Sequence, residues 1–127
     1  MRRQLAAMIA TAALLVAGNA ALAHHSFAMF DNDNPIELEG VVQEFKYTNP
    51  HSYLLLQVKG PDGGSVLWNL EGQAPSLLTR DGWSSHTIKP GDELKLSIDP
   101  LRSGAPGGRW FPEKTKHKDG RPLMVTP

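Results

Sequence analysis

The stretch IELEGVVQEFKY, residues 36–47, decides the fold of this chain. It alternates apolar and polar residues, as a strand buried on one face requires, with the apolar ones at Ile36, Leu38 and Val42. After Val42 the phase changes, because Phe45 and Tyr47 continue the apolar set on odd numbers. One residue must be absorbed near Gly40, where glycine permits a bulge or a sharp bend. A long first strand that bends in its middle can belong to two sheets.

The sequence after this stretch predicts two more strands and a helix. Tyr53–Val58 alternates, and Val66, Trp68 and Leu70 give a third strand after a glycine-rich hairpin loop at residues 60–64. After Leu70 the two-residue alternation of apolar residues ends. Pro75–Asp81 predicts one or two helical turns, since Pro suits the first turn of a helix and the following Gly82 can take the left-handed conformation that ends one.

Two further strands are expected towards the C-terminus. Lys89-Pro90-Gly91-Asp92 has the residues that a type II turn prefers at its centre, and it precedes a fourth alternating strand at residues 93–99. A loop rich in glycine and proline, residues 103–108, leads to a poorly patterned fifth strand that contains Pro112. Asp119-Gly120 is a hairpin signal.

This element order, β-β-β-α-β-β with a long bent first strand, is that of an OB-fold-like five-stranded barrel. The fold class predicted is therefore all-β with one short helix, formed as a single domain by residues 36–127. Barrel closure hides strand edges, which suits a small domain that has no disulfides. A small open β-sandwich is the alternative.

The N-terminus is typical of a secretory signal peptide. Arg2 and Arg3 precede an apolar run that is too short to span a bilayer, and Ala21-Leu22-Ala23 is a signal-peptidase pattern. We expect residues 1–23 to be removed, so that residues 24–35 form an N-terminal arm. The protein is then periplasmic and does not insert in the membrane.

The composition excludes several classes of function. The chain has 127 residues and no cysteine, so it has neither disulfides nor thiolate metal sites. Its 13 basic and 13 acidic residues cancel, which argues against a nucleic-acid partner. No nucleophile elbow, His-Glu-x-x-His or phosphate-binding glycine loop occurs. We expect a noncatalytic module without an obligatory cofactor, whose partner is a small ligand or an envelope protein.

His24 and His25 are the candidate metal ligands. Cleavage before His24 would leave an α-amine and an imidazole on one residue, a pair that chelates Cu(II), and His25 adds a second imidazole. The alternative is a polar leader without a metal. His51 is the best further ligand, but a straight first strand would put it at the end of the barrel opposite the arm, so the arm would have to double back almost fully extended.

A second candidate site is a ligand-binding surface. An OB barrel binds ligands on its second and third strands and the adjoining loops. The residues there that could contact a ligand are Asn49, His51, Tyr53, Trp68 and Trp83. The alternative is that the aromatic residues belong to the core. Exposure of Tyr53 or Trp83 would favour the binding surface.

The chain also resembles a known family. Ala23-His24-His25-Ser26-Phe27, Thr48-Asn49-Pro50-His51, the segment from Pro75 to Gly82-Trp83, Lys89-Pro90-Gly91-Asp92 and Pro100-Leu101-Arg102 are similar in order and spacing to the exported bacterial family known as domain of unknown function 6152. The resemblance implies an exported barrel-like domain, with no activity attached. Its recurring motif positions are His24, His25, Asn49, His51, Trp68 and Trp83. A looser similarity is to small exported OB-fold stress proteins, and the pattern departs from the family after Arg109.

Overall fold

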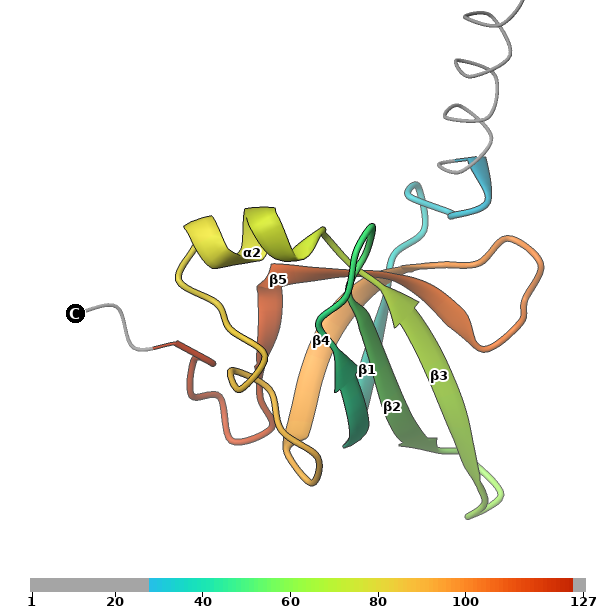
Figure 1. Ribbon diagram of the computed structural model, residues 1–127. Helices are drawn as coiled ribbons and strands as arrows, with labels where there is room; N and C mark the ends of the chain where they lie inside the picture. The colour runs from blue at the N-terminus through green and yellow to red at the C-terminus, as the bar shows by residue number, and fades with distance from the viewer. Residues whose placement is uncertain (1–27, 125–127) are drawn as a thin grey trace, which may run out of the picture.

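The computed structural model describes residues 28–124. The elements in chain order are β1 (Ile36–Lys46), β2 (Tyr53–Lys59), β3 (Ser65–Glu71), α2 (Pro75–Arg80), β4 (Glu93–Pro100) and β5 (Gly107–His117) (Figure 1). The strands form a closed barrel in the order β1-β2-β3-β5-β4, and a parallel β3–β5 pairing completes the ring. The predicted OB-fold-like barrel, all-β with a short helix, is confirmed, and the open sandwich is excluded.

β1 pairs with both β2 and β4 because it bends. Its register with β2 shifts between Val42 and Glu44, so the predicted bulge is present just after Gly40. Gly40 itself has another role: a Cβ added there would lie 2.5 Å from the carbonyl oxygen of Gln57. Glycine therefore lets β1 approach β2 closely, and the irregularity follows at Gln43.

The interior of the barrel is one apolar core. Leu54, Leu56, Leu70, Leu94 and Ile98 have no exposed surface. They lie at the alternating positions that the sequence pattern assigned to the inner faces. On β3 the apolar residues of one face are not equally buried: Val66 near the hairpin is 46% exposed, whereas Leu70 is fully buried.

The helix α2 begins and ends as its sequence predicts. Pro75 occupies its first turn, Asp81 is its C-cap, and Gly82 follows with φ of +84°. Leu78 points into the core, while its neighbour Leu77 stays 44% exposed. The hydroxyl of Tyr47, just after β1, lies 2.7 Å from Thr79 Oγ1 and joins the helix to the barrel.

β5 is irregular, in agreement with its weak pattern. Its pairing with β4 passes from Ile98↔Trp110 to Leu96↔Thr115, so residues 111–114 bulge out of the ladder. The Thr115 hydroxyl donates a 2.6 Å hydrogen bond to the carbonyl of Phe111 across this bulge. Pro112 lies in the bulge, where its missing N–H costs no ladder hydrogen bond.

The described part of the arm, residues 28–35, packs on the barrel. Asp31 N–H donates to the carbonyl of Pro100 at 2.8 Å, and Arg102 N–H donates to that of Met29 at 2.9 Å. Phe30 is consequently only 5% exposed. This segment, the β1–β2 loop and α2 all lie at the same end of the barrel (Figure 1). The predicted signal peptide, with His24 and His25 after it, lies outside the described residues.

Candidate functional site

A cleft of about 310 Å³ opens at this end of the barrel. We call it the loop-end cleft. The arm, the β1–β2 loop, the β3–α2 connection, α2 and the start of β5 each contribute to its lining, which consists of Phe30, His51, Glu71, Gly72, Gln73, Ala74, Leu77, Arg109, Trp110 and Phe111. Four parts of the chain that are distant in sequence thus meet at one site: the arm, the β1–β2 loop, the segment from the end of β3 into α2, and the start of β5.

The walls of the loop-end cleft are largely apolar. Trp110 is 1% exposed and is wedged between Trp83 and Phe45, with ring centroids 5.7 Å and 5.9 Å away. Phe30 forms another wall from the arm, and the exposed Leu77 lies at the edge of the cleft. A small ligand entering here would exchange water for aromatic and aliphatic contacts.

Arg109 lines the cleft, and a carboxylate already compensates its positive charge. Arg109 Nη2 lies 2.9 Å from Asp99 Oδ2, and the Asp99 side chain is only 5% exposed. The guanidinium carbon also lies 4.9 Å from the ring centroid of Phe111 and 5.9 Å from that of Phe30. The two rings and the carboxylate hold the guanidinium in place at the cleft wall, and the carboxylate compensates its charge.

His51 and Glu71 form a second polar pair in the cleft. His51 Nδ1 lies 3.3 Å from the carbonyl oxygen of Gly72, and His51 Nε2 lies 3.4 Å from Glu71 Oε1. A carbonyl oxygen can only accept a hydrogen bond, so Nδ1 carries the proton of this contact. The imidazole therefore turns Nε2 towards the carboxylate.

Gly72 makes this packing possible. A Cβ at this position would lie 2.2 Å from Nε1 of Trp110, so only glycine lets the indole approach the backbone. Nε1 of Trp110 is buried and has no hydrogen-bond partner within residues 28–124. The floor of the cleft is thus set by a direct contact between an indole and a glycine.

The structure separates the predicted ligand-binding residues. His51 lines the loop-end cleft, whereas Asn49 is exposed in the β1–β2 loop and precedes a cis Pro50. Tyr53 is half-buried at the start of β2, and Trp68 is half-buried against the core. Trp83 is 7% exposed and packs against Trp110, so this ring belongs to the core, which was the alternative interpretation of the aromatic residues.

His51 and the arm lie at the same end of the barrel, because β1 does not run straight. Phe30 of the arm and His51 of the β1–β2 loop line the same cleft. The bend of β1 and the return of the arm along the end of β4 shorten a path that a straight strand would have made long. His24 and His25 themselves are not described, but His25 is separated from Phe30 by a short chain whose extended length is only about 17 Å.

Sequence reasoning missed most of the cleft. Phe30, Leu77 and Phe111 carry no motif, and Glu71 and Arg109 lie at strand ends where the alternating pattern says nothing about partners. The adjacent Arg109-Trp110-Phe111 was the available signal, because an arginine next to aromatic residues can stack on their rings.

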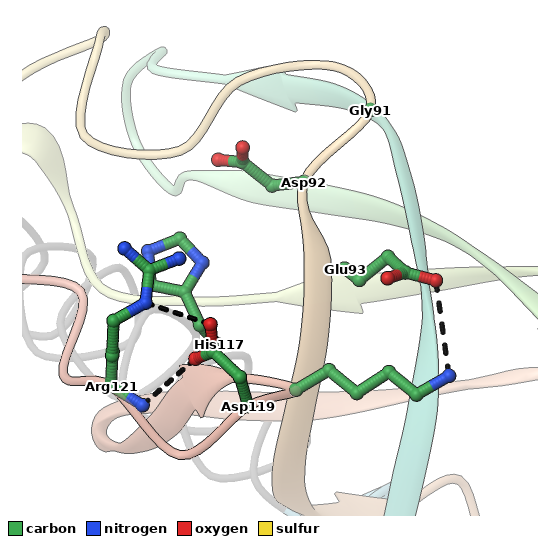
Figure 2. A pocket seen from close by; sticks show the side chains of 7 residues that line it. Gly91, Asp92, Glu93, His117, Asp119 and Arg121 are labelled. Carbon is green, nitrogen blue, oxygen red and sulfur yellow. Dashed lines mark hydrogen bonds and ion pairs between the residues drawn. The ribbon is translucent and has the colours of Figure 1, made fainter.

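A second hollow, of about 540 Å³, is lined by charged side chains near the β4 start and the β5 end (Figure 2). Its charges compensate one another: Arg121 Nε lies 2.7 Å from Asp119 Oδ2, and Lys118 Nζ lies 3.8 Å from Glu93 Oε1. Hydrogen bonds from Arg121 lower the pKa of Asp119, and a hydrogen bond to Glu39 raises the pKa of Lys118. We interpret this hollow as a solvated charged surface.

Within residues 28–124 the structure contains no group of three or more His, Cys, Asp or Glu side chains arranged for a metal. No helix in this part of the chain is long and apolar enough to cross a membrane.

Comparison with known families gives one match. The model of the Family of unknown function (DUF6152) matches residues 12–110, which extend from the N-terminal apolar run to Trp110. No curated protein and no solved structure matches the chain.

Proposed function

We propose that this chain, which belongs to the family of unknown function DUF6152, is an exported, noncatalytic periplasmic module that binds a small ligand in the loop-end cleft. The cleft itself carries the proposal. Ligand sites in proteins are concave, mostly apolar and equipped with a few fixed polar groups, and their volumes begin at about 300 Å³. A cleft of about 310 Å³ has room for a small, largely apolar molecule only.

Indole is a suitable probe for this cleft, because it is small, planar and neutral. Titration of indole into ¹⁵N-labelled protein should shift the backbone amides of Ala74, Leu77 and Phe111 along one saturable curve. Leu77→Asp should weaken this binding about tenfold, since it places a charge at the apolar edge. Val66→Asp is the matched control, because Val66 is equally exposed but lies near the β2–β3 hairpin. Shifts scattered over the surface, or equal effects of both variants, would contradict the proposal.

Export rests on the N-terminal sequence and has its own test. The natural chain should be recovered from the periplasmic fraction, and N-terminal sequencing should find His24 first. Recovery from the cytoplasm, or a terminus at another residue, would remove this part of the proposal. The indole titration is independent of that outcome.

A second candidate function is Cu(II) binding by the processed N-terminus, through His24 and His25 with His51 as a further ligand. The observation that favours it is that Phe30, close to these residues in the chain, lines the same cleft as His51. Cu(II) should be loaded onto processed protein and onto a version that carries one extra N-terminal Ala. The extra residue moves the terminal amine, so the affinity and spectrum should change. Indistinguishable spectra would refute this candidate.

A further inference from the structure

One edge of the barrel stays open along the first part of β3. This strand pairs with β2 along its whole length, but it pairs with β5 only at Asn69–Glu71. Within residues 28–124, no strand pairs with the other edge of residues 65–68. This part of β3 adjoins the β2–β3 hairpin and lies away from α2 (Figure 1).

The open edge presents the backbone groups of two residues. Asn69 N–H donates to the carbonyl of Pro106, so it points to the β5 side of the strand. Because hydrogen-bonding directions alternate along a strand, the N–H and C=O groups of Ser65 and Leu67 point to this side too. No described strand lies there to pair with them. Such an edge is a template for a further extended chain.

The side chains of this edge lack the features that usually prevent strand addition. Proteins protect open edges with lysine, proline or other charged residues, but residues 64–68 contain neither a charge nor a proline. Val66 is 46% exposed and Leu67 is 38% exposed, on opposite faces of β3. Val66 shares its face with Trp68, which packs against the core. The apolar interior therefore continues to the open edge.

We propose that this edge binds a second copy of the chain, with the two β3 strands antiparallel and a two-fold axis at Val66. In this register Ser65 of each copy lies opposite Leu67 of the other, and each such pair exchanges two backbone hydrogen bonds. The two Val66 side chains meet on one face, next to Trp68. The pairing ends before Asn69, where Pro106 already occupies the edge.

The charge of the edge indicates a copy of the chain as the occupant. A two-fold interface brings each patch against itself, so a charge near the axis would face its own image. Residues 64–68 carry no charge that would repel its image, and none that would select an acidic or basic peptide. The pairing is much shorter than the about 20–30 residues a side of a stable interface, so the dimer forms only at high concentration. This edge lies outside the lining of the loop-end cleft, so the inference does not rest on ligand binding there.

Sedimentation equilibrium of the processed chain tests this pairing. The average mass should rise from the monomer value at about 20 μM towards twice that value at about 1 mM. Val66→Lys should stay monomeric over this range, because it places two like charges opposite each other at the axis. Val41→Lys is the matched control and should dimerise as the natural chain does. Val41 is 41% exposed, but β1 is paired there with both β2 and β4.

A mixture of two charged variants shows whether loss of the dimer is an effect of charge or of misfolding. Val66→Lys and Val66→Glu should each be monomeric alone and should form a mixed dimer when combined, because unlike charges then meet at the axis. A natural chain that stays monomeric at about 1 mM, undiminished dimerisation of Val66→Lys, or a monomeric mixture would each overturn the proposal. The first result would leave the open edge to an extended segment of another protein.

Discussion

Gly72→Ala should destabilise the protein strongly although it adds one methyl group. The new Cβ would lie 2.2 Å from Trp110 Nε1, about 1.2 Å inside the range where ordinary contact begins, at 3.4 Å. The indole cannot retreat, because Trp83 and Phe45 pack against it. Nor can the backbone, because Gly72 N–H is hydrogen-bonded to the Ser52 carbonyl at 2.8 Å. Overpacking typically costs about 1–3 kcal/mol, and a site closed on both sides belongs in the upper half of that range.

A loss of about 2–3 kcal/mol lowers Tm by about 8–24 °C in a domain of this size. Urea unfolding, followed by circular dichroism, should show a lower midpoint with an unchanged slope. The control is Gly64→Ala, whose Cβ would meet only the rotatable Asp62 carboxylate at 3.2 Å. Its stability should stay within about 0.5 kcal/mol of the natural chain. If both variants are equally stable, the close approach of Trp110 to Gly72 is not a feature of the folded protein.

Three other perturbations test the surroundings of the cleft and of the charged surface. Asp99→Asn should lower the free energy of unfolding by about 2 kcal/mol, as measured in urea. Breaking a fully buried ion pair costs about 3–5 kcal/mol, and the loss here is smaller because Arg109 is partly exposed. An unchanged urea midpoint would contradict this prediction. Phe30→Ala should cost about 3 kcal/mol and abolish indole binding, whereas retained binding would show that the arm is not a wall of the site. The hydrogen bond to Glu39 raises the pKa of Lys118 above its ordinary value of 10.5. The natural chain should therefore be more stable than Lys118→Met below pH 10.5, and this difference in unfolding free energy should vanish as the pH rises through the raised pKa. A difference that persists at higher pH would exclude the contact.

The fold could be predicted because its determinants are local. Alternation assigns Leu54, Leu56 and Leu94 to the inner face without knowledge of their partners. Proline and glycine mark where the chain turns. Gly82, predicted to end the helix, and Gly91, predicted at the centre of a type II turn, both have positive φ. The bulge in β1 was predicted for the same reason, since an insertion in a two-residue period is visible in the sequence itself.

The site could be predicted only in part because it is not local. His51 was identified, but Glu71 reaches it only through the β2–β3 pairing, in which Tyr53 lies opposite Glu71. Whether Trp83 lies on the surface or in the core stayed open, because the sequence does not show which way the chain leaves α2. The distance from the arm to His51 also depends on how far β1 curls, which the length of the strand does not show.

The closure of the barrel explains why the cleft lies at this end. β3 and β5 pair only over Asn69–Glu71 and Gly107–Arg109, the part of each strand next to the cleft. Asn69 N–H also donates a hydrogen bond to the carbonyl of Pro106 at 3.2 Å, which ties β3 to the loop before β5. Towards the β2–β3 hairpin β3 has no pairing with β5, and Val66 there is exposed. His51, Glu71 and Arg109 are therefore held at the end where the ring of strands is complete, which is where a binding site gains most from a rigid support.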